Sequence, residues 1–215
     1  MRRMLLLPAL CLFLAAVLVP ASTANAAAGD AAAVLPGGGR VIIDVGWIAP
    51  LGDLGDRLDA TPTGAGARPG FEIGLEWRFA LSRTWSLAPT GHYLGYGDAT
   101  GLGTSGEESL SPSSLRYGAE LMISSDRAGT QWFAGVGPAY VRSVLKGPGK
   151  DHITLVDASK SGWGLSARAG LRFGDTELSA VYHLNRFRSF GFFAAAEEQS
   201  YDWGTVALRL GWRLP

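Results

Sequence analysis

From Arg40 to Pro215 the chain consists of short segments in which apolar and polar residues alternate, separated by stretches rich in Gly, Pro, Ser and Asp. The clearest segment runs from Phe71 to Phe79 and reads Phe-Glu-Ile-Gly-Leu-Glu-Trp-Arg-Phe. Successive side chains of a β-strand point to opposite faces, so one face of this strand is entirely apolar and the other carries glycine and charges. The period of two predicts strands and argues against helices.

Eight such segments can be recognised, and their lengths suit a tilted crossing of a hydrocarbon layer. They are Arg40–Ile48, Gly70–Leu81, Trp85–Tyr96, Ser114–Ile123, Gln131–Arg142, Gly162–Phe173, Glu177–Phe187 and Tyr201–Leu214. Short links follow the second, fourth and sixth segments, and long links follow the others, at Ala49–Pro69, Gly97–Ser113, Ser143–Ser161 and Arg188–Ser200. This alternation is typical of outer-membrane barrels, with turns on the periplasmic side and loops outside. The predicted fold is an all-β, eight-stranded antiparallel up-and-down transmembrane barrel.

The first residues have the features of an export signal. Arg2 and Arg3 precede an apolar run from Leu5 to Val19, and Ala24-Asn25-Ala26 is a small-residue cleavage site. Pro8, within the run, and Pro20, directly after it, leave the apolar stretch too short for a comfortable membrane anchor. The sequence therefore predicts a cleaved signal peptide (1–26), an N-terminal leader segment (27–39) and a barrel domain (40–215).

Composition excludes several classes of function. The only cysteine, Cys11, lies in the predicted signal peptide, so the mature chain offers no disulfide and no thiol nucleophile. Cleavage removes Arg2 and Arg3, which leaves 17 basic against 19 acidic residues, a net charge of −2 that is unlike the basic footprint of a nucleic-acid binder. The three histidines have no metal-ligand spacing. We expect no metal, no cofactor and no nucleic-acid partner.

Aromatic residues favour a barrel whose apolar face points outward. A soluble lipocalin-like barrel has the opposite polarity, with apolar residues inside. Aromatic side chains near strand ends form the interfacial girdles of membrane barrels. Those residues here are Trp47, Trp77, Phe79, Trp85, Trp132, Tyr140, Trp163, Phe173 and Trp212. The pattern predicts an integral protein of a Gram-negative outer membrane, in contact with its lipids.

An outward apolar face places charged residues of both signs inside the barrel. They are Asp44, Glu72, Glu76, Arg78, Arg116, Glu120, Arg168, Arg172, Arg209 and Arg213. Eight strands enclose a space that side chains can fill. Unpaired buried charges cost several kcal/mol, so these carboxylates and guanidiniums should pair. We therefore predict a plugged, porin-like fold without a wide aqueous pore.

One local feature has catalytic potential. His183 and Asn185 are two residues apart on one predicted strand and so share a face. His183 can act as a general base and Asn185 can orient a substrate carbonyl. The alternative is that both are ordinary polar residues of the lumen, and the facing of this strand stays open because Val181 shares a face with His183.

At these residues the chain resembles the outer-membrane lipid A 3-O-deacylases, the PagL-like eight-stranded barrels. The resemblance covers Gly74–Trp77, Thr90–Tyr96, Phe133–Gly137, Ala167–Phe173 and the strand with Tyr182 and His183. The family carries a His-x-Ser-Asn motif, so the resemblance implies His183 as base and Glu197 or Glu198 as the orienting acid. The position of the nucleophilic serine is Asn185, which cannot form an acyl-enzyme.

These observations lead to one main hypothesis and two alternatives. The main hypothesis is a non-catalytic barrel, structural or binding a ligand or lipopolysaccharide through its external loops. The lysines Lys146, Lys150 and Lys160 fall in one predicted loop and can attract lipid phosphates. The alternatives are a lipid A ester hydrolase that uses His183 and a narrow diffusion channel.

Overall fold

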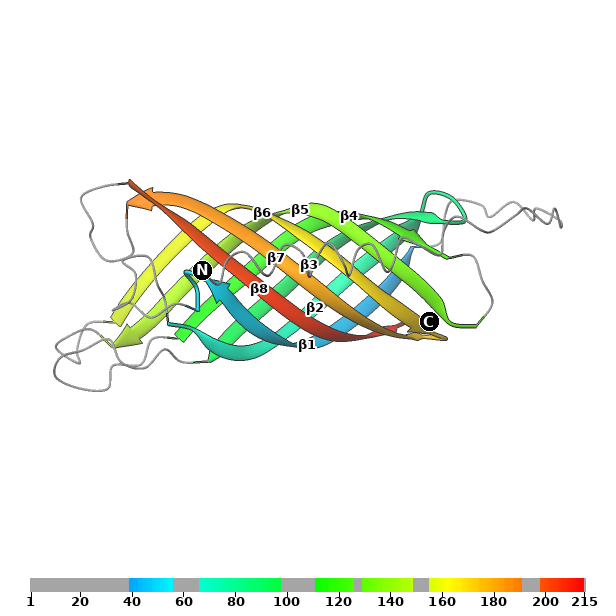
Figure 1. Cartoon of the computed structure of the whole chain (residues 1–215), viewed down its shortest axis with the longest axis horizontal. Coiled ribbons are helices and arrows are strands. Elements are labelled where there is room, and N and C mark those ends of the chain that lie inside the picture. The colour runs from blue at the N-terminus through cyan, green and yellow to red at the C-terminus, as the bar shows by residue number, and fades with distance from the viewer. Residues whose placement is uncertain are drawn as a thin grey trace, which may run out of the picture. The chain divides into compact units, whose positions relative to one another are not determined.

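The computed structural model describes residues 39–55, 66–97, 111–125, 129–148, 155–190 and 198–214. The predicted signal peptide and all of the leader segment except Gly39 lie outside these ranges. The described residues form eight strands that close into one barrel (Figure 1). The strands are β1 (Arg40–Gly52), β2 (Arg68–Ala80), β3 (Trp85–Gly97), β4 (Ser111–Ser124), β5 (Gln131–Pro148), β6 (Leu155–Phe173), β7 (Thr176–Phe190) and β8 (Glu198–Arg213).

Every strand pairs antiparallel with its neighbours in the chain, and β1 pairs with β8 to close the barrel. The closing ladder runs from Ile42 opposite Arg213 to Gly52 opposite Trp203. Closure leaves no strand with an unpaired edge, so the backbone groups along the wall bond to one another. The predicted fold class, an eight-stranded antiparallel up-and-down barrel, is confirmed. No helix within the described ranges is long and apolar enough to cross a membrane.

The barrel has two ends that differ in their connections. At one end, here called the turn end, residues 81–84, 125–130 and 174–175 join β2 to β3, β4 to β5 and β6 to β7. Gly174 has a φ of 61°, which suits a two-residue hairpin turn. The Ser82 hydroxyl accepts hydrogen bonds from the backbone N–H groups of Thr84 and Trp85, at 3.3 and 3.0 Å. The opposite end, here called the loop end, carries the other four connections.

Two predicted loops are shorter than expected. Of Arg188–Ser200 only residues 191–197 join β7 to β8, because these strands pair as far as Phe190 opposite Glu198. The larger difference lies between β5 and β6. Residues Ser143–Ser161 do not form a long loop, because β5 and β6 stay paired as far as Pro148 opposite Leu155. Only residues 149–154 join the two strands. Backbone pairing between neighbouring strands needs no apolar face, so the ladder continues after the apolar alternation has stopped. Lys146 and Lys160 therefore belong to strands, and Lys150 lies outside the described residues.

The apolar face of the strands points outward. On β2 the side chains of Phe71, Leu75 and Trp77 are 56, 53 and 52 % exposed, whereas those of Glu72 and Glu76 are buried. All eight strands contribute exposed large hydrophobic residues to the outer wall. The tryptophans 47, 85, 163 and 212 belong to this outer surface as well. The barrel thus has an apolar outer surface and a lumen lined by charged side chains.

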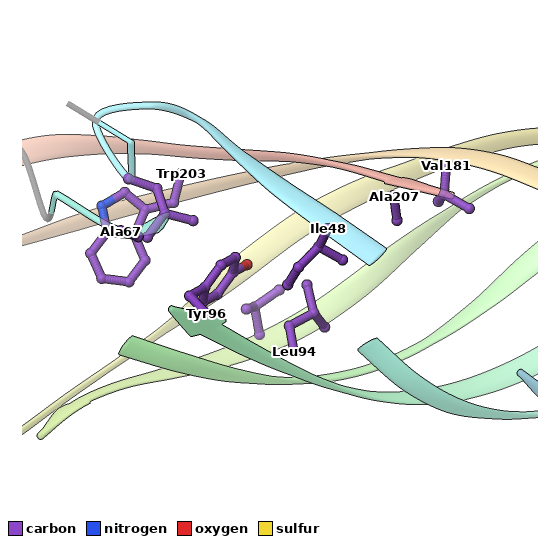
Figure 2. Packing of buried hydrophobic residues seen from close by; sticks show 9 residues of the cluster. Ile48, Ala67, Leu94, Tyr96, Val181, Trp203 and Ala207 are labelled. Atoms are coloured by element: carbon purple, nitrogen blue, oxygen red, sulfur yellow. The ribbon is translucent and has the colours of Figure 1, made fainter. Parts of the chain in front are cut away.

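The interior at the loop end is closed by apolar side chains, here called the apolar plug. Its members are Ile48, Leu54, Ala67, Leu94, Tyr96, Val141, Val181, Trp203 and Ala207. In Figure 2, Tyr96, Ile48 and Leu94 are grouped together, with Trp203 and Ala67 on one side of them and Ala207 and Val181 on the other. Leu54, which is fully buried, enters the mouth after a turn at Gly52, where φ is 59°. Its carbonyl accepts a hydrogen bond from the N–H of Ala67 at 2.9 Å, which ties the two ends of the β1–β2 connection together.

Candidate functional site

The lumen near the turn end holds three carboxylates and three guanidiniums in one continuous chain, here called the turn-end cluster. Its members, in order of contact, are Glu120, Arg168, Glu76, Arg78, Glu177 and Arg172. Arg78 binds Glu177 with two parallel hydrogen bonds of 2.9 and 3.1 Å. Glu76 accepts from Arg78 at 2.6 Å and from Arg168 at 2.5 Å. Charges of the two signs are equal in number, so the cluster is neutral as a whole.

Phe133 lies at the centre of the turn-end cluster and is 1 % exposed. The guanidinium carbons of Arg78, Arg168 and Arg172 lie 5.5, 5.7 and 5.9 Å from the centroid of its ring. A cation above an aromatic face is attracted by the ring quadrupole, and more strongly when water is excluded. The ring therefore adds a cation–π attraction to guanidiniums that are already paired with carboxylates.

A second polar group, here called the central cluster, lies between the turn-end cluster and the apolar plug. It comprises Asp44, Glu72, His92, Arg116, His183 and Arg209, all of them buried. Glu72 is its hub, because it accepts two hydrogen bonds from Arg209, at 2.9 and 2.5 Å. The same carboxylate lies 3.2 Å from His92 Nδ1 and 3.4 Å from His183 Nε2. Gly74 makes room for this arrangement, since a Cβ there would lie 2.1 Å from His92 Nδ1.

His183 is fixed by Arg209, whose Nη2 lies 2.8 Å from His183 Nε2. A guanidinium can only donate, so Nε2 accepts this bond and the ring proton is on Nδ1. His183 Nδ1 itself has no hydrogen-bond partner. The one lone pair that a general base would use is therefore already occupied.

Asn185 points into the lumen as well, and its Oδ1 accepts a hydrogen bond from Arg116 Nη1. Both side chains are almost completely buried. Two further polar pairs lie in the lumen: Tyr96 and Thr205 share a hydrogen bond of 2.9 Å, and Ser114 and Ser143 share one of 2.7 Å. These hydroxyl groups lie among the side chains of the apolar plug, to which Tyr96 itself belongs.

The structure answers the open question of how β7 faces. Val181, His183 and Asn185 are 2, 1 and 1 % exposed and point inward, whereas Leu178 is 52 % exposed on the outer wall. Glu198 begins β8, but its side chain and all of Glu197 lie outside what the structure describes. Of the four residues in the hydrolase hypothesis, the structure thus places two side chains, His183 and Asn185. Both lie in the lumen, and each is hydrogen-bonded to an arginine.

Nine of the ten charged residues expected inside the barrel belong to the two clusters. The tenth, Arg213, is partly buried at the turn end, where its Nη1 lies 3.8 Å from Asp175 Oδ1. The sequence reasoning missed Glu177, His92 and Phe133. Glu177 could have been found, because it is separated from His183 by an even number of positions along one strand and so shares its face.

The chemistry available in the lumen is that of paired charges. Ser166 lies opposite His183 in the β6–β7 ladder, but its hydroxyl donates to Glu120 at 2.8 Å. No described group of three or more His, Cys, Asp or Glu side chains is arranged to hold a metal ion. The arrangement cross-links the wall of the barrel from inside.

A closed eight-stranded barrel with an apolar exterior and an ionic lumen has the fold of small outer-membrane proteins. Neisserial surface protein A matches 82 % of this chain and 96 % of its own chain, with a TM-score of 0.55 and 13 % identity. Ail, the attachment invasion locus protein of Yersinia pestis, matches with a TM-score of 0.44 and 16 % identity over 82 % of this chain and 99 % of its own. The outer membrane protein OprG of Pseudomonas aeruginosa matches 82 % of this chain and 96 % of its own chain, with a TM-score of 0.44 and 13 % identity.

The structural match to Neisserial surface protein A supports the fold, and at 13 % identity it says nothing about activity. No protein-family model and no curated protein sequence matches the chain. The resemblance to the lipid A deacylases therefore stays a prediction.

Proposed function

We propose that this protein is a non-catalytic, integral barrel of a Gram-negative outer membrane, with a lumen closed to ions and small solutes. The observation that carries the proposal is the reversed polarity of the wall, in which apolar side chains of all eight strands are exposed. Soluble monomers rarely expose a contiguous apolar surface larger than a few hundred Å². A hydrocarbon layer removes that surface from water, and a closed barrel satisfies the backbone inside it.

Membrane insertion is tested directly with the mature chain. We expect the unfolded polypeptide to fold only after detergent or lipid vesicles are added, and to sediment with the vesicles afterwards. Folded barrels of this kind can be followed by a shift in gel mobility between heated and unheated samples. A chain that is folded and soluble without any amphiphile would overturn the proposal.

The closed lumen rests on three layers of side chains: the turn-end cluster, the central cluster and the apolar plug. Each layer contains residues from several strands, so no single side chain can swing away to open a path. Single-channel recordings in planar bilayers should show no large conductance for the unmodified protein. The double variant Trp203→Ala, Leu54→Gly lacks two of the largest side chains of the apolar plug. It should still not form a wide pore, because the turn-end cluster and the central cluster remain. A large, stable conductance of the unmodified protein would favour the diffusion-channel alternative.

The absence of catalysis is also a proposal, supported by the position of His183. Its Nε2 is engaged by Arg209, and its ring is surrounded by buried side chains. Mass spectrometry of lipid A from cells that express the protein should show an unchanged acyl pattern. Loss of a 3-hydroxyacyl chain that disappears in His183→Ala would establish the hydrolase alternative instead.

Contact with lipopolysaccharide is the remaining element of the proposal. An outer-membrane barrel presents its loop end to the outer leaflet, and that end carries cationic side chains such as the exposed Arg142. Guanidiniums bind phosphate through short charge-assisted hydrogen bonds. Retention of lipopolysaccharide by the purified barrel, compared with a phospholipid of similar charge, tests this contact.

A further inference from the structure

We propose that the outer wall of β4, β5 and β6 carries a binding site for the phosphorylated sugar headgroup of lipid A. The site lies at the loop end, where a guanidinium and three hydroxyl groups stand above a row of aromatic rings. Its residues are Arg142, Ser113, Ser159 and Ser161, with Tyr117, Tyr140 and Trp163 below them. The inference rests on the proposed placement of the barrel in an outer membrane.

Depth in the membrane follows from the outward residues of β5. From Trp132 at the turn end to Tyr140, every outward position holds an apolar or aromatic residue, and the next outward residue is Arg142. Arg142 is ten positions after Trp132, which is about one tilted crossing of the hydrocarbon layer. The Arg142 guanidinium thus lies at the level of the outer headgroups.

The neighbouring strand gives the same depth independently. The outward residues of β6 are apolar from Phe173 to Trp163, and the next two are Ser161 and Ser159, both exposed. Ser161 lies directly opposite Arg142 in the β5–β6 ladder. The switch from apolar to polar therefore occurs in the same row on both strands.

The hydroxyl groups surround the guanidinium on both sides. Val144, the outward residue after Arg142, lies opposite Ser113 of β4 and Ser159 of β6. Directly opposed Cβ atoms are about 5 Å apart and diagonal ones about 7 Å. A phosphate bound to Arg142, or the sugar that carries it, is therefore within reach of these three hydroxyl groups.

Below the polar row lies an aromatic row that fits the boundary between headgroup and acyl chains. Tyr140 lies opposite both Tyr117 and Trp163. The rings of Tyr140 and Trp163 meet edge to face with centroids 5.7 Å apart. Trp163 is 70 % exposed, more than any other large hydrophobic residue among the described ones. Such amphipathic rings prefer the interface between water and hydrocarbon.

Charge selects an anionic ligand at Arg142. Its ladder partners, Leu115 and Ser161, are uncharged. Arg186 offers a contrast, because it is an exposed arginine of β7 that lies opposite Trp163 of β6 and directly opposite Asp202 of β8. An amine-bearing phospholipid would bring its own cation next to Arg142, whereas the phosphates of lipid A carry no such cation. A guanidinium whose ladder partners are uncharged therefore favours lipid A, and Arg186, which has an acidic ladder partner, is the control.

The test uses the full mature barrel, folded in neutral phosphatidylcholine vesicles or nanodiscs. Native mass spectrometry then measures retention of lipid A, of the same lipid A without phosphates, and of phosphatidylglycerol. We expect the unmodified barrel to retain lipid A preferentially and Arg142→Gln to weaken this retention about tenfold, as loss of charged hydrogen bonds does. Arg186→Gln should change it less than twofold. All variants alter exposed residues, and gel mobility verifies that each is folded.

The outcomes separate the two proposals. Failure to insert into the neutral vesicles, which contain no lipid A, would overturn the membrane proposal and this site with it. A barrel that inserts but binds lipid A equally well with and without Arg142 lacks the site. Equal retention of phosphatidylglycerol and lipid A, or of phosphorylated and dephosphorylated lipid A, would likewise contradict it.

Discussion

The two ionic clusters of the lumen have similar compositions but very different degrees of pairing. In the turn-end cluster the two buried atoms without a hydrogen bond, Glu120 Oε2 and Arg168 Nε, still form an ion pair of 2.7 Å with each other. In the central cluster both oxygens of Asp44, both ring nitrogens of His92 and one nitrogen each of Arg116, His183 and Arg209 have no hydrogen-bond partner. One cluster is a closed chain of contacts and the other is an incomplete network.

The difference follows from how many strands supply complementary groups in the same layer. Around Phe133, carboxylates from β2, β4 and β7 meet guanidiniums from β2 and β6. In the central layer one carboxylate, Glu72, takes most of the donors, and Asp44 remains 3.6 Å or more from the nearest ones. Completed networks stabilise and rigidify a core, whereas incomplete ones weaken it. We therefore expect the turn-end cluster to contribute more to stability.

The strongest test of this comparison is Glu76→Gln in the turn-end cluster. The substitution keeps the shape but removes the charge that binds Arg78 and Arg168, and its amide group cannot accept from both guanidiniums with the same strength. Breaking a buried ion pair from one side costs roughly 3–5 kcal/mol. Urea unfolding of the vesicle-inserted barrel, followed by tryptophan fluorescence, should show a loss of this size. A loss below about 1 kcal/mol would contradict a dominant role for this cluster.

Phe133→Leu tests the aromatic centre of the same cluster with a smaller expected effect. Leucine retains most of the apolar contact but loses the ring face beneath three guanidiniums, and a desolvated cation–π contact contributes about 2 kcal/mol or more. We expect the free energy of unfolding to fall by roughly 2 kcal/mol on this basis. Phe71→Leu on the outer wall is the matched control, because Phe71 is 56 % exposed. Equal losses in both variants would show that the guanidiniums do not depend on the ring.

Asp44→Asn is the counterpart of Glu76→Gln in the central cluster. Both Asp44 oxygens lack hydrogen bonds, and its nearest cation, Arg209, is 3.7 Å away and already bound to Glu72. The carboxylate oxygens accept no hydrogen bond, so replacing them by an amide breaks none. We therefore expect the free energy of unfolding to change by no more than about 1 kcal/mol. The same urea titration measures it. A loss as large as that of Glu76→Gln would remove the distinction between the two clusters.

The strands, their order and the direction of their apolar faces could be predicted because a period of two is a local property of the sequence. The facing of β7 could not, since Val181 interrupts a face that is otherwise polar. Partners inside the lumen were equally beyond reach, because Arg78 and Glu177 are 99 positions apart and meet only when the barrel closes. The extension of β5 and β6 was missed because backbone pairing leaves no apolar pattern there.

The last prediction concerns a substitution that should not create deacylase activity. Asn185→Ser introduces the serine that the deacylase resemblance lacks, two residues after His183. The new hydroxyl would face Arg116 inside the lumen, and His183 Nε2 would still accept from Arg209 rather than from the serine. We expect an unchanged lipid A acyl pattern, and a modest loss of stability of about 1 kcal/mol from the weakened bond to Arg116. Deacylation by this variant would mean that lipid reaches the central cluster. The incomplete hydrogen bonding there would then indicate a site that opens to substrate, and not only a less stable layer of the interior.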